Sequence, residues 1–309
     1  MFLVRDRPTI HMTHATPVSA PAASPTSVSM PAPSTPTAHI PPRTLTIAGS
    51  DSGGGAGIQA DLKTFAALGC FGMTAITAIT VQNTLGVSGV HAIPPEIVGA
   101  QIDAVASDLG VDAAKTGMLG SPEIVHAVAA ALDRCSLTQL VVDPVMIATS
   151  GATLSSHDTA RAMVRELFPR ARLVTPNLIE AAWLLGREIH TEDQMDAAAE
   201  ALLQLGCHAV LLKGGHLDQP ILSDLLLCAD GTREVIRHPR IATRNLHGTG
   251  CTLAAAVTAH LARGLGLTEA VRGGIEYVTQ AIAAGARWSL GRGNGPLDHG
   301  AGNACSLSR

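Results

Sequence analysis

The strongest constraint on the fold is an alternation of short, mostly apolar segments with amphipathic helical segments. The segments expected to be strands lie at residues 44–48, 73–81, 113–115, 140–143, 173–177 and 209–213. Helix signals separate them, such as the prolines at Pro94 and Pro95 that open a helical segment. Apolar strands that alternate with helices are typical of a mostly parallel sheet covered by helices on both faces. The sequence therefore predicts an α/β fold.

Polar residues stand at the ends of these predicted strands. They are Asp51, Gln82 and Asn83, Lys115 and Thr116, Asp143, Asn177 with Glu180, and Lys213. In open α/β sheets, ligands bind beyond the carboxyl ends of the strands, where such side chains gather. The pattern therefore indicates an enzyme with its site at this edge of the sheet.

Residues 1–42 differ in composition from the rest of the chain. Pro, Ser, Thr and Ala dominate between Thr13 and Pro42 with almost no charge, so this segment cannot bury enough apolar surface to offset its ordering entropy. We expect residues 1–42 to be a disordered tail, residues 43–299 to be one α/β domain, and residues 300–309 to be a flexible C-terminal tail. Within the domain, Asp230-Gly231 between two short strand-like segments predicts a hairpin.

Composition excludes several classes of function. A formal net charge of −4 provides no electrostatic basis for binding nucleic acid or an anionic membrane surface, and only 2% of the residues are aromatic, too few for a base-stacking platform. No apolar run approaches the roughly 18 residues of a membrane span. Six cysteines without CxxC spacing favour reduced thiols over a zinc site or a disulfide framework. We therefore expect a cytoplasmic protein that acts on small molecules.

The loop His247–Thr252 is the centre of the predicted site. Gly248 and Gly250 allow a close approach of the backbone to a phosphate, and the first amides of the helix that follows point outward and suit an anion. Cys251 lies at the mouth of this site, and we expect its pKa to be lowered because a helix N-terminus favours the thiolate. A phosphate cradle that contains an ionisable group suggests phosphoryl transfer. The alternative is a plain turn before a core helix, with a buried and inert cysteine.

A second glycine-rich loop, Ser52–Gly57, lacks the G-x-x-x-x-G-K-[ST] pattern of a P-loop and is weak evidence by itself. It becomes specific in combination with six other segments. In chain order the seven are AGSDSGGGAGIQADLK, VQNTLGV, KTGML, VDPVM, TPNLIEA, LKGGH and HGTGCT. This set resembles the hydroxymethylpyrimidine/phosphomethylpyrimidine kinases of thiamine biosynthesis, which belong to the ribokinase-like superfamily. The resemblance implies a ribokinase-like three-layer α/β/α sandwich with a mostly parallel central sheet.

The resemblance also implies catalytic and nucleotide-binding residues. Cys251 matches the catalytic residue of the family, a general base for the substrate hydroxymethyl group, at a position where many sugar kinases of the superfamily have aspartate. Gly248, Thr249 and Gly250 would direct amides at the transferred phosphoryl group, and Lys213 would lie near the ATP phosphates. The implied ATP contacts are Asn177, Lys213 and Thr249.

Further positions are implied to hold the substrate ring and a metal. Asp61 and Gln82 match residues that hold the aminopyrimidine ring, and Met118 and Val145 match positions that pack against it. The candidates for organising Mg²⁺, partly through water, are Asp143 and Glu180. The structural alternatives are a solvated helix residue for Asp61, a strand-end turn residue for Gln82, and strand-end caps or ion pairs for the phosphate and metal candidates.

The implied activity is ATP- and Mg²⁺-dependent phosphorylation of 4-amino-5-hydroxymethyl-2-methylpyrimidine, and then of its monophosphate to the diphosphate at the same site. One alternative is a pyridoxine/pyridoxal kinase of the same superfamily, although Gln82 favours the pyrimidine because an aminopyrimidine edge pairs well with an amide. Another is a non-catalytic pyrimidine-binding protein, against which the intact His247–Thr252 loop argues. Members of the family are often dimeric, so a homodimer is compatible with the resemblance. We expect no fused thiamine-phosphate synthase domain, because the chain stops within ten residues of a family-like end at 295–299.

Overall fold

The structure is a computed structural model that describes residues 40–146, 155–215 and 219–302. These residues form a nine-stranded sheet in the order β3-β2-β1-β4-β5-β6-β7-β8-β9. The strands are β1 (Arg43–Asp51), β2 (Phe71–Asn83), β3 (Gly86–Ala92), β4 (Ala113–Thr116), β5 (Leu140–Val142), β6 (Leu173–Val174), β7 (Ala209–Leu212), β8 (Ile221–Cys228) and β9 (Arg233–Pro239). The strands β2, β1, β4, β5, β6 and β7 pair in parallel in this order, whereas the pairings that involve β3, β8 and β9 are antiparallel. The predicted mostly parallel sheet is confirmed.

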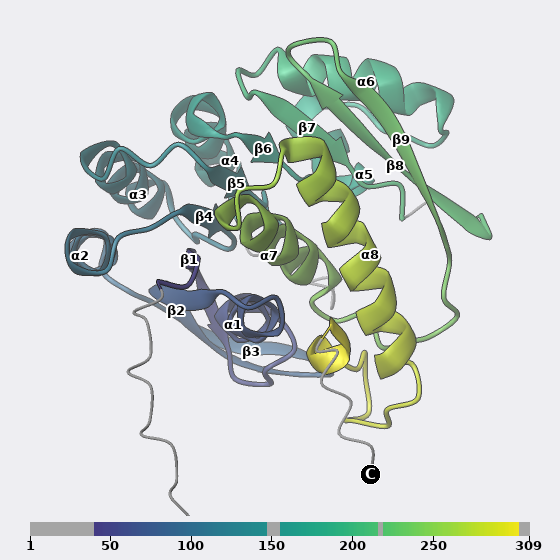
Figure 1. Cartoon of the computed structure of the whole chain (residues 1–309), viewed down its shortest axis with the longest axis horizontal. Helices are drawn as coiled ribbons and strands as arrows, with labels where there is room; N and C mark the ends of the chain where they lie inside the picture. The colour runs from purple at the N-terminus through teal and green to yellow at the C-terminus, as the bar shows by residue number, and fades with distance from the viewer. Residues whose placement is uncertain (1–39, 147–154, 216–218, 303–309) are drawn as a thin grey trace, which may run out of the picture. The chain divides into compact units, whose positions relative to one another are not determined.

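Helices cover both faces of the sheet (Figure 1). They are α1 (Gly57–Ala67), α2 (Pro95–Asp108), α3 (Pro122–Arg134), α4 (His157–Glu166), α5 (Leu178–Leu185), α6 (Asp193–Leu203), α7 (Thr249–Ala262) and α8 (Leu267–Gly285), with 3-10 turns η1 (Phe168–Arg170) and η2 (His299–Gly302). Helices α2 to α6 share one apolar core with the sheet, and α7 and α8 share the other. Phe65 of α1 packs on Ala255 and Ala259 of α7, on the same side as α8. Among the helices of the described ranges, none has the length and apolarity to cross a membrane.

The central strands explain why the sequence pattern is so clear. Every residue of β4, β5, β6 and β7 is buried, because helices lie on both faces, so these strands are apolar almost throughout instead of alternating. The polar exceptions are Lys115 and Thr116 in β4, and both side chains are fully buried. The charge of Lys115 has a high desolvation cost in this position unless it is paired.

One edge of the sheet carries the predicted hairpin, and the other edge carries a strand that the sequence pattern does not predict. The expected hairpin at Asp230-Gly231 joins β8 to β9, and Gly231 adopts the left-handed conformation with φ 89°. At the opposite edge, β2 continues to Asn83 rather than ending at Val81, and the chain turns back into β3. The β3 sequence, GVSGVHA, contains two glycines, which weaken a strand signal. Gln82 therefore lies in a strand and not in a turn.

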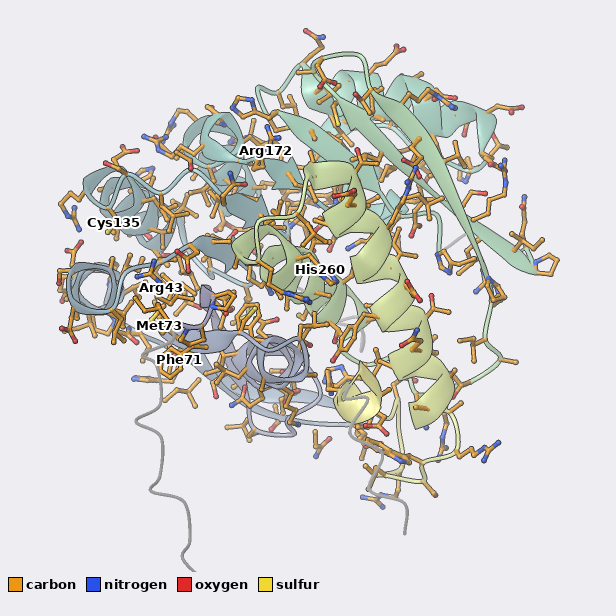
Figure 2. The ribbon with its side chains drawn as sticks, viewed as in Figure 1. Arg43, Phe71, Met73, Cys135, Arg172 and His260 are labelled. Carbon is orange, nitrogen blue, oxygen red and sulfur yellow. The ribbon has the colours of Figure 1, made fainter. Side chains whose placement is uncertain are left out.

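Close packing of α7 on α8 fixes the helix that carries the predicted site. A Cβ at Gly274 of α8 would lie 2.7 Å from the Val257 side chain, and one at Gly273 would lie 2.8 Å from Nε2 of His260. His260 projects from α7 near its C-terminal end (Figure 2), and burial lowers its pKa, which favours the neutral ring. Only glycine allows this approach of the two helices.

The described residues from Ile40 onward belong to one compact unit. Residues 1–39 and 303–309, which make up most of the two expected tails, lie outside the described ranges. η2 crosses the expected boundary at residue 299, and it is tied to the helices beside it. His299 Nε2 lies 3.1 Å from Thr252 Oγ1 at the start of α7, and the His299 carbonyl accepts a hydrogen bond from Tyr277 Oη at 2.6 Å.

Leu140→Ala tests the two-sided burial of β5. Leu140 is 0% exposed, so its truncation leaves a cavity, and we expect the free energy of unfolding to fall by about 2–5 kcal/mol. Urea unfolding followed by far-UV circular dichroism measures the change. As a control, Leu290→Ala, at a position 51% exposed, should shift the unfolding free energy by less than about 1 kcal/mol. Equal effects of the two substitutions would contradict the assigned burial.

Candidate active site

The N-terminus of α7 meets the second glycine loop at a very close contact. Gly248, the N-cap of α7, has φ 88°, and a Cβ there would lie 1.9 Å from the carbonyl oxygen of Gly55. No residue other than glycine fits this position without moving one of the loops. The helix begins at Thr249, inside the segment His247–Thr252 that was predicted as the loop. The predicted loop-to-helix transition is therefore present, and its backbone packs closely on residues 52–57.

Cys251 lies in the first turn of α7, next to the first residue of α1. The backbone N–H of Gly57, the first residue of α1, donates a hydrogen bond to the Cys251 sulfur. Burial nevertheless raises the pKa of this thiol to about 11, and the nearby Lys115 ammonium only partly offsets the effect. The predicted lowering of the Cys251 pKa is therefore wrong. Helix ends favour the thiolate, but here the loss of water around the sulfur, together with the Asp61 and Asp143 carboxylates, outweighs them.

A fully buried ion pair lies near Cys251. Lys115 Nζ is 3.0 Å from both carboxylate oxygens of Asp61, and Thr46 Oγ1 donates to Asp61 Oδ2 at 2.6 Å. Both charged side chains are 0% exposed. Burial alone would lower the pKa of Lys115, but the Asp61 carboxylate, together with Cys251 and Asp143, outweighs burial and raises this pKa above its usual value. Sequence reasoning gave Lys115 no role, although a lysine inside an otherwise apolar strand was the available signal.

This pairing bears on the predicted substrate contact of Asp61. Both of its oxygens already have protein partners, and its side chain is not exposed to any open space. The structural alternative, a solvated helix residue, is wrong, because Asp61 is completely buried in α1. A ring contact by Asp61 remains a prediction that would require rearrangement of the pair.

Asp143, Lys213 and Gly250 come together at the carboxyl ends of β5 and β7. Lys213 Nζ lies 3.4 Å from Asp143 Oδ1, and Thr175 Oγ1 donates to the same oxygen at 3.1 Å. A Cβ at Gly250 would lie 3.5 Å from Lys213 Nζ and 3.7 Å from Asp143 Oδ2. The start of α7 thus lies directly beside one ammonium and one carboxylate.

Asn177 and Glu180 form a reciprocal cap at the start of α5. The Glu180 N–H donates to Asn177 Oδ1 at 2.9 Å, and the Asn177 N–H donates to Glu180 Oε2 at 2.8 Å. Burial raises the pKa of Glu180 to about 7; Lys213 opposes this rise and Asp143 adds to it. Both residues therefore have the capping role that was left open as an alternative. Asn177 also bridges to Lys213 in the sheet, which links the cap to the site.

Asp143 and Glu180 are the two residues that the sequence suggests as metal ligands. Among residues 40–146, 155–215 and 219–302, no group of three or more His, Cys, Asp or Glu side chains is placed to hold a metal ion. Asp143 and Glu180 are both buried and are close enough for their charges to interact. Two carboxylates suit a largely hydrated Mg²⁺ that is also bound by substrate phosphates, which is the usual way Mg²⁺ is held.

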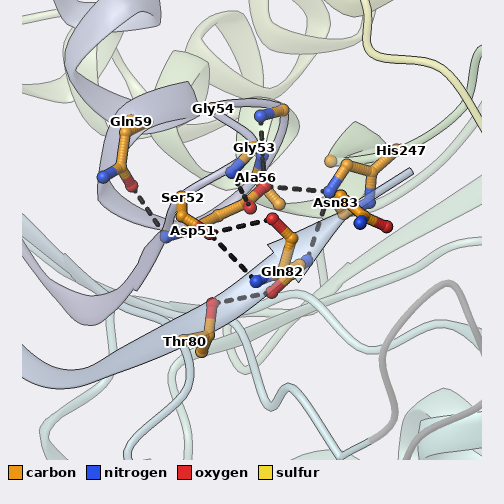
Figure 3. Close-up of polar contacts among 12 residues, drawn as sticks. Asp51, Ser52, Gly53, Gly54, Ala56, Gln59, Thr80, Gln82, Asn83 and His247 are labelled. Carbon is orange, nitrogen blue, oxygen red and sulfur yellow. Dashed lines mark hydrogen bonds and ion pairs between the residues drawn. The ribbon is translucent and has the colours of Figure 1, made fainter. Parts of the chain in front are cut away.

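Gln82 belongs to a network that joins β2 to both glycine loops (Figure 3). Its Nε2 lies 3.3 Å from His247 Nε2, and Thr80 Oγ1 donates to its Oε1 at 3.0 Å. His247 Nε2 also lies 2.9 Å from Asp51 Oδ2. The backbone of Gln82 and the Ser52 hydroxyl exchange two further hydrogen bonds, at 2.8 and 2.9 Å. The Gln82 amide is thus fixed between the loops by Thr80 and His247, and its contact with a substrate ring stays a prediction.

The same network explains why residues 52–57 are not a phosphate cradle. The Asp51 carboxylate accepts the amide N–H groups of Gly53, Gly55 and Ala56 at 2.8, 3.1 and 2.9 Å. Burial would raise the pKa of Asp51, but the His247 and amide hydrogen bonds outweigh it, so the pKa lies below its usual value. The amides that a phosphate would need are therefore occupied by an internal carboxylate. From the sequence, Asp51 was named only among the strand-end polar residues and His247 only as the first residue of the loop, and neither was given a role.

Met118 and Val145 follow the ends of neighbouring strands. Met118 is buried, and its methyl group would lie 2.7 Å from a Cβ at Gly49, so it packs over β1. Val145 is half-buried and precedes residues 147–154, which lie outside the described ranges. Their contact with a substrate ring stays a prediction.

Comparisons with known proteins identify the family. A family model described as phosphomethylpyrimidine kinase matches residues 51–298. The hydroxymethylpyrimidine/phosphomethylpyrimidine kinase of Rhizobium meliloti is 52% identical over 258 residues, which cover 82% of this chain and 96% of that protein.

Two solved structures are also similar. The phosphomethylpyrimidine kinase of Clostridium difficile has a TM-score of 0.69 at 45% identity, over 78% of this chain and 99% of its own. The pyridoxal kinase of Staphylococcus aureus, solved with AMP-PCP and pyridoxal, has a TM-score of 0.77 at 38% identity, over 85% and 95%. The chain therefore belongs to the phosphomethylpyrimidine kinase family.

Proposed function

We propose that this chain uses ATP to phosphorylate 4-amino-5-hydroxymethyl-2-methylpyrimidine, and then converts the monophosphate to the diphosphate at the same site. One observation carries the proposal: the start of α7, with Cys251 in its first turn, lies beside Lys213 and Asp143 at the carboxyl edge of the sheet. The names of the curated relatives support the substrate. The S. aureus structure with AMP-PCP, an ATP analogue, supports the phosphoryl donor.

In the proposed reaction Cys251 acts as the proton acceptor. Its thiolate takes the proton of the substrate hydroxyl, the hydroxyl oxygen bonds to the γ-phosphorus, and the bond from that phosphorus to the bridging oxygen of ADP breaks with its electron pair. Amides of the loop containing Gly248, Thr249 and Gly250 stabilise the charge on the phosphoryl oxygens. In the second round the nucleophile is a phosphate oxygen of the monophosphate, so one anion site serves both steps.

Lys213 and the capped start of α5 are proposed to hold the nucleotide. The Lys213 ammonium neutralises phosphate charge, and Asn177 and Thr249 contact the phosphates. When bound, Mg²⁺ would supply positive charge at the phosphates, and Asp143 and Glu180 would hold it partly through water. The burial of both carboxylates beside Lys213 supports this assignment.

The substrate ring is proposed to contact Gln82, with Met118 and Val145 packed against it and Asp61 as a further partner. The support for Gln82 is its fixed amide beside His247, because a preorganised amide loses little entropy on pairing with an aminopyrimidine edge. Asp61 has weaker support, since Lys115 and Thr46 occupy its oxygens.

We also propose a cytoplasmic homodimer. The five cysteines of the described residues are all free thiols, which suits a reducing compartment. For the dimer, the support is the exposure of apolar side chains on β2, on β3 and in the turn between them, at one edge of the sheet. They are Phe71, Ile79, Val81, Leu85 and Val90. Exposed apolar side chains at a sheet edge are commonly covered by a partner.

Pyridoxal kinase activity is the second candidate. The S. aureus pyridoxal kinase has a higher TM-score than the C. difficile phosphomethylpyrimidine kinase, although its sequence identity is lower. We expect the purified chain with ATP and Mg²⁺ to convert the hydroxymethylpyrimidine to its diphosphate, as resolved by mass, and to form much less pyridoxal phosphate. Strong pyridoxal turnover without a pyrimidine diphosphate would overturn the substrate assignment.

Cys251→Ala tests the proposed base. We expect kcat on the hydroxymethylpyrimidine to fall by about 10²–10⁴-fold, which is the usual contribution of general acid–base catalysis, with a smaller change in KM. Steady-state kinetics with coupled detection of ADP measures both constants. Cys228→Ala, which removes another partly buried thiol on β8, should retain turnover. If kcat of Cys251→Ala equals that of the unmodified chain, Cys251 is not the base.

The pH dependence follows from the raised pKa of Cys251. With a pKa of about 11 the resting group is a thiol at neutral pH, and its thiolate fraction grows about tenfold per pH unit below the pKa. Glu180 has a pKa of about 7, so its own ionisation affects the rate near neutral pH. Above about pH 8 Glu180 is mostly ionised, and a further rise in rate there reports ionisation of the Cys251 thiol. We expect kcat/KM to keep rising there, and to lose this rise in Cys251→Ala. A profile that is flat above pH 8 would contradict the thiolate mechanism.

A further inference from the structure

The residue after Lys213 is held by a side chain rather than by the sheet. Strand β7 ends at Leu212, and the N–H of Gly214 donates to Asp224 Oδ1 in β8 at 2.9 Å, in a buried position. The chain also packs closely on β8, because a Cβ at Gly214 would lie 2.1 Å from the Ser223 carbonyl oxygen. Asp224 itself is 5% exposed. A buried carboxylate therefore fixes the peptide that directly follows the proposed nucleotide-binding lysine.

His238 in β9 supplies the second partner of this carboxylate. His238 Nε2 lies 3.2 Å from Asp224 Oδ2, so the two oxygens of Asp224 have separate partners. Asp224 pairs with Ile236 across the two strands, which places His238 two residues further along β9 and on the same face of the sheet. A buried carboxylate needs such partners, because an unpaired charge away from water has a high free-energy cost. The imidazole thus holds the carboxylate that holds Gly214.

Lys213 is attached on its other side to the capped start of α5. Its own N–H donates to the Pro176 carbonyl oxygen at 2.9 Å, and Asn177 bridges to it in the sheet. The Gly215 carbonyl oxygen accepts a hydrogen bond from Nη2 of Arg240, directly after β9, at 3.2 Å. The backbone of these residues is therefore held between α5 and the β8–β9 end of the sheet. A displacement on the hairpin side would move the Lys213 ammonium.

We propose that Asp224 and His238 are positioning residues for nucleotide binding, which hold Lys213 where the ATP phosphates bind. Asp224 fixes the Gly214 N–H, and with it the direction in which the Lys213 side chain leaves the backbone. His238 keeps the carboxylate oriented, and neither residue contacts the nucleotide. The inference rests on the proposed nucleotide-binding role of Lys213 and adds the two side chains that place it. A small displacement of a binding group is enough to weaken its interaction with a phosphate.

The test is the affinity of the intact chain for AMP-PCP with Mg²⁺, measured by isothermal titration calorimetry, together with KM for each substrate. Asp224→Ala leaves the buried Gly214 N–H unpaired, so we expect AMP-PCP to bind about fivefold or more weakly and KM for ATP to rise by a similar factor. KM for the hydroxymethylpyrimidine should change by less than about twofold, because the proposed ring contact Gln82 belongs to β2, on the other side of the sheet. A role in folding alone would not divide the two substrates in this way.

Two further variants separate position from charge and from folding. Asp224→Asn keeps an oxygen for the Gly214 N–H, and its amide can donate to Nε2 of the other His238 tautomer. We expect this variant to bind AMP-PCP within about twofold of the unmodified chain. His238→Ala changes a less buried side chain and should weaken AMP-PCP binding by at least about twofold, so it provides the test if Asp224→Ala does not fold.

Asp230→Ala is the matched control. Asp230 also accepts a backbone N–H in this hairpin, that of Thr232 at 2.9 Å, but it lies at the exposed turn between β8 and β9. Its loss should leave AMP-PCP binding and both KM values unchanged.

Three results would overturn the inference: an Asp224→Ala variant that binds AMP-PCP as tightly as the unmodified chain, an equal rise in KM for both substrates, or an Asp224→Asn variant as weak as Asp224→Ala. Lys213→Gln should also weaken AMP-PCP binding. If it does not, the pair does not act through Lys213 and the inference is wrong. The pyrimidine kinase assignment fails separately if the unmodified chain binds AMP-PCP but forms no pyrimidine phosphate.

Discussion

The rest of the site depends on the contact between two glycine loops. Gly248 approaches the Gly55 carbonyl so closely that an added Cβ would lie 1.9 Å from it. This approach brings the starts of α1 and α7 together, so that an N–H from one helix reaches a thiol on the other. Two glycine-rich segments that are nearly two hundred residues apart thus form one structure. His247 and Asp51 hold it closed through a 2.9 Å contact.

The parallel sheet supplies the charges that surround this contact. Neighbouring strands β4 and β5, and β7 beyond them, end at the same edge, so Lys115, Asp143 and Lys213 meet near the start of α7 although each follows a separate apolar segment. The two lysines are surrounded by the carboxylates of Asp61, Asp143 and Glu180. Attraction between the opposite charges limits the free-energy cost of burying them. The arrangement is a preorganised set of dipoles and charges, which is what stabilisation of a transferring phosphoryl group requires.

Local patterns predicted the parallel sheet, the hairpin at Asp230-Gly231 and the loop before α7, because each depends on a short sequence segment. The family was recognisable from seven segments in order. Other features depend on distant contacts. The high pKa of Cys251 reflects burial by other elements, and the partner of Asp61 comes from a different strand. The edge strand β3 lacks a clear apolar pattern. Burial and pairing of this kind arise only from tertiary packing.

We propose that phosphoryl transfer takes place at the start of α7, beside the Cys251 sulfur. A crystal structure of the chain with AMP-PCP, Mg²⁺ and the hydroxymethylpyrimidine would show where the reacting groups bind. We expect the γ-phosphate on the amides of residues 249–251, with the substrate hydroxymethyl oxygen within hydrogen-bond distance of Cys251 Sγ. A γ-phosphate on residues 52–57, or a hydroxymethyl group turned away from Cys251, would contradict it.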